Sequence, residues 1–180
     1  MIRAFLALAL PDPLIHRLSI VQHGLRLHCP VPRENLHLTL AFLGAQPEPA
    51  LEDLHLALEN RVFQAPVIQV AGLGVFGGAS PRNLHMRVDP NPVLMALQAR
   101  VARMAAQSGI ALERRKFVPH ITLARFAVGE VTAPALAAMI ETVGAISGGP
   151  FVSAEMVLLR STLRASGPVY DPMANYPLIP

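Results

Sequence analysis

His37-Leu38-Thr39-Leu40 and His120-Ile121-Thr122-Leu123 are two copies of one pattern, in which a histidine and a threonine stand two residues apart inside an apolar run. Positions i and i+2 of a β-strand point to the same face, so each copy would place an imidazole beside a hydroxyl. A polar pair on the solvated face of a strand is the alternative for one copy. Its repetition in a chain with five threonines and seven histidines favours two matching functional strands.

Similar elements surround each copy of the pattern. A helix precedes each motif strand, and a helix followed by strands comes after it, with the two histidines separated by nearly half of the chain. This order predicts two halves of like topology whose motif strands turn their polar faces toward one shared cleft. The expected strands are 3–10, 36–43, 66–75, 84–88, 117–126, 151–159 and 169–176, and the expected helices are 13–28, 48–62, 91–107 and 133–143.

Length and composition place the chain among self-sufficient globular domains. A chain of 180 residues can bury one substantial core, and no linker divides it, so we expect a single domain over residues 1–180. The single cysteine, Cys29, fits a reducing compartment, where a buried or semi-buried thiol is the simplest expectation. The apolar run 4–10 is followed by Pro11-Asp12-Pro13 without a cleavage site, and no stretch is long enough for a membrane span. A cytoplasmic protein with no membrane contact is therefore expected.

Basic residues flank the second copy, although the net charge is only +3. Arg114-Arg115-Lys116 precede it and Arg125 follows it, and the planar guanidinium of arginine suits phosphate oxygens. A solvated basic turn is the alternative for the run before the strand.

Other candidate sites are weak. The glycines of 72–77 match a dinucleotide-binding pattern, but a Gly-Gly-Ala-Ser-Pro turn follows instead of a helix, so a strand end and a turn are expected. The acidic residues form no Asp-x-Asp or His-rich cluster for a metal site, and no phosphate-binding glycine loop or serine nucleophile elbow occurs. Among these kinds of site, acid/base catalysis by histidines without a metal or cofactor is the one that remains. The other histidines have no partner in sequence and are expected to be surface or structural residues: His16, His23, His28, His55 and His85.

Two imidazoles can supply both halves of acid/base catalysis, because each can be populated in both protonation states near neutral pH. One neutral imidazole would activate water, and one protonated imidazole would protonate a departing ribose oxygen. The hydroxyls of Thr39 and Thr122 would hold phosphoryl oxygens whose charge grows in the transition state. These groups are the ones required to cleave a phosphodiester when water attacks phosphorus from the side opposite to the leaving oxygen.

The chain resembles the 2H phosphoesterase superfamily, defined by its paired HxTx motifs, and within it the RNA 2′,3′-cyclic phosphodiesterase or 2′-5′ RNA ligase family. The resemblance runs from end to end and rests chiefly on residues 33–44 and 117–125, supported by 3–5, 76–82 and 161–170. It implies an α+β fold of two pseudo-symmetric, interleaved lobes, with largely antiparallel sheets lining a central cleft and helices outside. Relatives often carry a tryptophan before the first motif, whereas this chain has Cys29-Pro30-Val31-Pro32, so the substrate-side surface is where it departs from the family.

The resemblance also implies the activity and the roles. A 2′,3′-cyclic phosphate, on an RNA end or a small nucleotide, would be hydrolysed to a 2′-phosphomonoester without a metal, with His120 as proton acceptor and His37 as proton donor. Thr39, Thr122 and Arg125 would bind the phosphate. Strict alternation would turn Arg125 away from the cleft, so a bulge near Ala124 is expected. Ligation through a 2′-5′ bond is the alternative within enzymes, and a non-catalytic binder of phosphorylated RNA ends is the alternative outside them. A monomer is expected by default.

Overall fold

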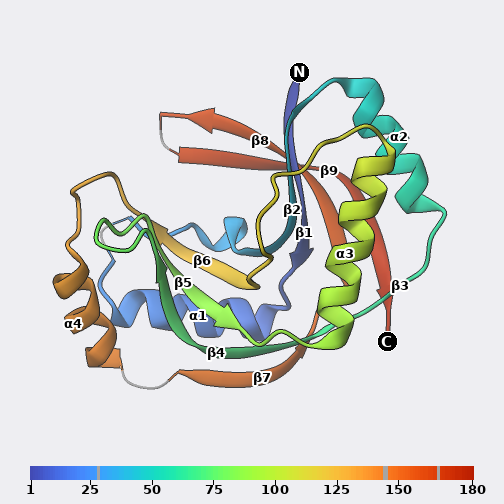
Figure 1. Ribbon diagram of the computed structural model, residues 1–180. Coiled ribbons are helices and arrows are strands. Elements are labelled where there is room, and N and C mark those ends of the chain that lie inside the picture. The colour runs from blue at the N-terminus through green and yellow to red at the C-terminus, as the bar shows by residue number, and fades with distance from the viewer. Residues whose placement is uncertain (28, 144–145, 166) are drawn as a thin grey trace.

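A computed structural model describes residues 1–180 except residues 28, 144–145 and 166 (Figure 1). In the described chain one nine-stranded mixed sheet runs in the order β3-β9-β8-β1-β2-β6-β5-β4-β7, and every pair of neighbours is antiparallel except β3 and β9. The elements are β1 (Ile2–Ala9), α1 (Asp12–Gly24), a 3-10 turn (Arg33–Asn35), β2 (His37–Gln46), α2 (Glu48–Glu59), β3 (Phe63–Gln64), β4 (Val67–Phe76), β5 (Asn83–Val88), α3 (Pro92–Gln107), β6 (His120–Arg125), α4 (Ala133–Val143), β7 (Ser147–Val152), β8 (Glu155–Arg164) and β9 (Gly167–Ile179).

The sheet narrows at its middle, between the two motif strands. β2 and β6 share the single paired position Leu38 and Ile121, whereas β1 pairs with β2 along its whole length and β5 pairs with β6 over most of its length. The narrowing divides the strands into one group around β2 (β3, β9, β8, β1) and another around β6 (β5, β4, β7). The α+β class and the largely antiparallel sheet expected from the sequence are confirmed.

Each group of strands is covered by the helix that precedes the motif strand of the other group in sequence, an arrangement that we call the helix exchange. α1 precedes β2 in sequence but covers the β6 group (Figure 1); its Gln22 bonds to β6, and its Arg17 guanidinium lies against Gly148 of β7. α3 precedes β6 but lies against the β2 group, where Arg100 covers the ring of Phe63 with its guanidinium carbon 4.5 Å from the ring centre. Apolar residues such as Leu14 and Leu94 anchor these helices in the core.

Local signals explain most helix starts. Pro13 stands in the first turn of α1, and the Asn91 side chain accepts a hydrogen bond from the Leu94 N–H at the start of α3. α2 and α1 both end earlier than the sequence predicts, at Glu59 and Gly24. The last expected residue of the first helix, His28, lies outside the described residues.

Four expectations about strands and loops are wrong. β2 continues through Gly44, which adopts φ 74, to Gln46; a glycine tolerates this conformation, so it bends the strand without ending it. The region expected as one strand over 151–159 belongs to two strands, β7 and β8, and the second motif strand begins at His120 instead of residue 117. The Cys29 thiol is exposed, not buried, because it lies in the loop after α1. In the part of the chain that the structure describes, no helix has the length and apolar character to cross a membrane.

Candidate active site

The two HxTx motifs lie side by side at the centre of the sheet. Leu38 and Ile121 are paired and completely buried. Extending this antiparallel register by one residue on each side sets His37 across from Thr122 and Thr39 across from His120. All four side chains are partly exposed and project from the face of the sheet opposite to the two buried residues. The arrangement has an approximate twofold axis through the central pair.

Both motif histidines are oriented in the same way. Nδ1 of His37 donates to the Asn35 carbonyl at 2.7 Å, and Nδ1 of His120 donates to the Val118 carbonyl at 2.8 Å. A carbonyl only accepts, so each neutral ring carries its proton on Nδ1 and has a lone pair on Nε2. Asn35 is itself held, because its side-chain amide donates to the Pro168 carbonyl at 2.9 Å.

Burial and cationic neighbours disfavour the charged form of both imidazoles. Desolvation is the main cause that lowers the pKa of His37 to about 4, and the charges of Arg125 and His120 lower it further. Desolvation also lowers the pKa of His120, again with a contribution from Arg125. The positive field of Arg125 therefore reaches both motif histidines, and both are neutral in the free protein at pH 7.

A bulge follows the threonine in each motif strand. β5 pairs His85 with Thr122 and Leu84 with Ala124, so Leu123 is the extra residue on β6. This is the bulge expected near Ala124, and it changes the phase of the strand so that Arg125 lines the pocket described below. β2 repeats the feature, since β1 pairs with Thr39 and Ala41 and leaves out Leu40.

A glutamine on the covering helix contacts each bulge. The Gln22 amide donates to the Leu123 carbonyl and to the Val31 carbonyl, both at 2.9 Å, and the Gln98 amide lies 3.4 Å from the Leu40 carbonyl. The Leu123 carbonyl also accepts from the Val31 N–H at 2.8 Å, so Gln22 is its second donor. The helix exchange thus supports both motif strands from behind.

A pocket of about 540 Å³ opens beside the motifs. Two aromatic rings that line this pocket also contact His37. The centre of the Phe5 ring lies 4.9 Å and that of the Tyr170 ring 5.3 Å from the centre of the imidazole. Phe42 stands three residues after Thr39, as Arg125 stands three after Thr122, and its side chain is 59% exposed. A smaller hollow of about 250 Å³ includes His37 and shares Tyr170 with the pocket. The residues that line the pocket of about 540 Å³ include Arg3, Phe5, Phe42, Glu113, Arg115, Arg125, Ser161 and Tyr170.

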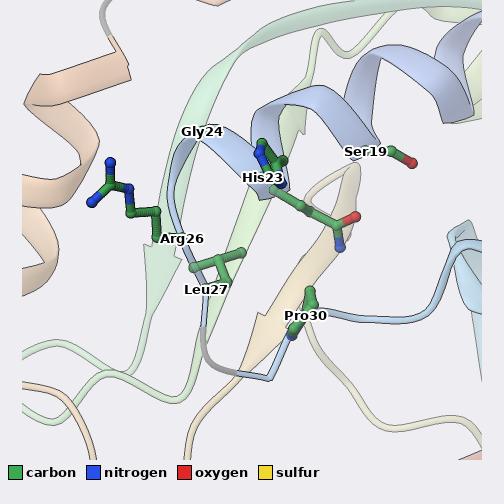
Figure 2. Close-up of a pocket in the computed structure, with 7 residues that line it drawn as sticks. Ser19, His23, Gly24, Arg26, Leu27 and Pro30 are labelled. Carbon is green, nitrogen blue, oxygen red and sulfur yellow. The ribbon is translucent and has the colours of Figure 1, made fainter.

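A larger hollow, of about 670 Å³, lies at the C-terminal end of α1 (Figure 2). It contains no residue of either HxTx motif, and its lining comes mainly from the helix end and the loop after it. The pocket of about 540 Å³ is likewise lined by none of the HxTx residues, but Phe42 of β2 and Arg125 of β6 both line it, so we assign the chemistry to that pocket. The residues that line the larger hollow are Ser19, Gln22, His23, Gly24, Arg26, Leu27 and Pro30.

The other residues that the sequence suggested for a site lie outside the pocket beside the motifs or at its edge. Of the basic run before the second motif, Arg115 lines the pocket and pairs with Glu113 at 2.6 Å, while the whole run is exposed. His55 is a structural residue as expected, with Nδ1 3.1 Å from the Tyr176 hydroxyl. The glycines of 72–77 belong to a strand end and a turn, also as expected. Among the described residues, no three His, Cys, Asp or Glu side chains gather as metal ligands would.

Several residues around the motifs could not be identified from the sequence. His85 was expected to be a surface or structural histidine without a partner in the site, yet its ring centre lies 5.1 Å from that of His120. Phe76 and Tyr170 contact one motif histidine each. All depend on which strands pair, which local patterns do not reveal. The two glutamines that bond to the bulges give no shared signal either, because Gln22 lies in the last turn of α1 and Gln98 in the middle of α3.

Known proteins share the sequence and the fold. A protein-family model described as "2′-5′ RNA ligase superfamily" matches residues 10–165. A curated RNA 2′,3′-cyclic phosphodiesterase of Aeropyrum pernix is 31% identical over 142 residues, which cover 78% of this chain and 80% of that protein. One of Thermus thermophilus, with the same curated name, is 31% identical over 188 residues, covering 98% and 90%.

Solved structures of other proteins have the same fold. A crystal structure of a Thermus thermophilus protein superimposes with a TM-score of 0.80 at 28% identity, covering 98% of this chain and 97% of that one. Escherichia coli LigT in complex with 3′-AMP shares the fold, with a TM-score of 0.76 at 24% identity and coverage of 98% and 97%. Paired HxTx motifs, matching fold and the family match over most of the sequence lead to one conclusion: the chain belongs to the 2′-5′ RNA ligase superfamily, a family of 2H phosphoesterase enzymes.

Proposed function

We propose that the protein hydrolyses the 2′,3′-cyclic phosphate of RNA or nucleoside ends to a 2′-phosphomonoester by acid/base catalysis with His37 and His120, without a metal. One observation carries the proposal: two imidazoles with the same tautomer stand diagonally across one strand pair, each beside the threonine of the other motif. The curated name of the relatives supports the substrate.

In the proposed reaction His120 Nε2 accepts a proton from water as the water oxygen attacks phosphorus. The bond from phosphorus to the ribose 3′ oxygen breaks, and protonated His37 gives its proton to that oxygen. The 2′ ester bond remains, so the product is a 2′-phosphomonoester. The hydroxyls of Thr39 and Thr122 donate to the phosphoryl oxygens, and the Arg125 guanidinium offsets their charge in the transition state.

The pocket beside His37 suits the nucleoside. Because His37 protonates the ribose oxygen, the ribose has to lie on the His37 side of phosphorus, where Phe5 and Tyr170 contact the imidazole. The exposed Phe42 ring offers a surface for stacking a base, and Arg115 at the rim can meet a backbone phosphate. An RNA end fits this pocket chemically, as does a single nucleotide.

Turnover of a panel of 2′,3′- and 3′,5′-cyclic nucleotides, with the phosphate position of the product identified by phosphorus NMR, tests the proposal. We expect hydrolysis confined to the 2′,3′ compounds, with a 2′-phosphomonoester as product and the same rate in the presence of EDTA. Cleavage of only the 3′,5′ compounds would refute the substrate assignment. Loss of activity in EDTA, restored by a divalent metal, would refute the metal-free mechanism.

The pH dependence should differ between kcat/KM and kcat. In the free protein kcat/KM requires neutral His120 and protonated His37, so it falls as pH rises above the pKa values of both rings, of which that of His37 is about 4. A bound phosphodiester anion favours the charged imidazoles and raises both pKa values. We therefore expect the optimum of kcat at higher pH than that of kcat/KM, since kcat reports the substrate complex. Identical profiles for the two parameters would contradict this electrostatic account.

Ligation is a second candidate, favoured by the description of the family. The same groups can open the ring with a 5′-hydroxyl in place of water: the 5′ oxygen attacks phosphorus, the bond to the ribose 3′ oxygen breaks and a 2′-5′ bond results, but water competes in dilute solution. We propose hydrolysis as the main activity, in a monomer located in the cytoplasm. A product of joined length from matched RNA halves, exceeding the hydrolysed ends on a gel, would reverse that order.

A further inference from the structure

A third histidine packs against His120 on the β5 side of β6. His85 is only 3% exposed, and its ring centre lies 5.1 Å from that of His120 at an interplanar angle of 63°. Phe76 of β4 stacks on His85 at 4.2 Å and meets His120 edge-on at 5.0 Å. The three rings contact one another in a closed triangle, which limits rotation of the His120 ring.

The orientation of His85 is itself fixed. Its Nδ1 donates to the Asn83 side-chain oxygen at 3.1 Å, and its Nε2 faces Gly74 of β4. A Cβ atom added at Gly74 would lie 2.5 Å from this Nε2. Gly74 does not adopt a positive φ, so its backbone does not require glycine. The missing side chain at this position leaves the space that His85 fills.

Among the residues that the structure describes, the other half of the site has no equivalent of His85. β5 pairs His85 with Thr122, whereas β1 pairs Ala7 with Thr39 at the related position. The rings against His37 are Phe5 and Tyr170, neither of which is an imidazole. The approximate symmetry is therefore broken on the side of the proposed proton acceptor.

We propose that His85 is a positioning residue for His120 in the hydrolysis proposed above: with Phe76, it holds the imidazole of His120 at the angle that presents Nε2 to the attacking water. The inference rests on that proposed function. His85 itself stays off the substrate, because it is buried behind His120 and its Nδ1 is bonded to Asn83.

The electrostatics agree with this role. Burial lowers the pKa of His85 to about 4, and the charges of His120 and Arg87 lower it further, so the ring is neutral at pH 7 and adds no charge beside His120. The charged or titratable groups that face His120 are Arg125 on its own strand, Arg87 across from it on β5, and His37 from β2. Removing the His85 ring would admit water and so raise the pKa of His120.

The test compares kcat, KM and the pH profile of His85→Ala, His85→Phe and Gly74→Ala. We expect His85→Ala to lower kcat about tenfold or more, as misplaced catalytic groups do, with KM unchanged and the limb of the kcat/KM profile that reports His120 moved to higher pH. Gly74→Ala displaces His85 without altering it and should lower kcat in the same way. His85→Phe keeps a packed ring and should retain most of kcat. The exposed His16 on α1 provides the matched control, His16→Ala, with parental values.

Titration of the His120 ring by NMR in the same variants gives a readout that needs no turnover. The pKa of His120 should rise in His85→Ala and stay low in His85→Phe. Parental kcat together with an unchanged His120 titration in His85→Ala would overturn the inference, as would a change confined to KM. If His85→Ala does not fold, the same two measurements on Gly74→Ala decide. A parent protein without hydrolytic activity would refute the proposed function instead, while the titration would still report on the ring contact.

Discussion

Replacing either motif histidine by alanine is expected to lower kcat by about 10² to 10⁴-fold, the usual contribution of a positioned general acid or base. His37→Ala removes the proton donor and His120→Ala removes the proton acceptor, so the double variant should be no more than slightly worse than either single one. Both side chains are partly exposed on the cleft face of their strands, so the fold should remain intact. The measurement is kcat on a nucleoside 2′,3′-cyclic phosphate, with circular dichroism to monitor folding.

The control for this experiment is His23→Ala, which removes an exposed imidazole at the end of α1, in the hollow that contains no motif residue. It should leave kcat at the parental value. Hydrolysis at an undiminished rate by the His37→Ala, His120→Ala double variant would reject the two-histidine mechanism, whatever the substrate.

The second large effect is expected at Arg125. Arg125→Met keeps much of the side-chain length but removes the cation, and kcat should fall about 10² to 10³-fold, as on loss of one donor to a developing oxyanion. The same charge lowers the pKa of both motif histidines. Both limbs of the kcat/KM profile should therefore move to higher pH in the variant, which a residue that only contacts the base would not cause.

Arg103→Met is the matched control, because Arg103 is exposed on α3 and does not line the pocket beside the motifs. A normal kcat in Arg125→Met with a raised KM alone would show that Arg125 holds the substrate equally in the ground state and the transition state. That result would remove Arg125 from the stabilisation of the transition state.

The sequence predicts those parts of the site that depend on local spacing. His37 and Thr39 share a face because side chains alternate along any strand, and the same holds for the second motif. A bulge was expected from the position of Arg125, and the pairing of β5 with β6 locates it at Leu123. Such local inferences need no knowledge of which strands are neighbours.

Features that depend on tertiary pairing could not be predicted. His85 reaches His120 only because β5 lies beside β6, and nothing near His85 in sequence indicates that contact. Cys29 was expected to be buried because apolar thiols usually are, but the loop after α1 leaves it in solvent. Tyr170 comes close to His37 through the pairing of β9 with β8, of β8 with β1 and of β1 with β2, three steps along the sheet.

The helix exchange also constrains how the polypeptide can acquire its native state. Gln22 of α1 bonds to a carbonyl 101 positions later in the chain, so α1 emerges from the ribosome long before its partner strand β6. Contacts this distant in sequence slow folding. Of two fragments cut near the middle, the first would hold α1 without β6, and the second would hold α3 without β2. We expect neither fragment to be stable alone, and the two together to recover one cooperative unit.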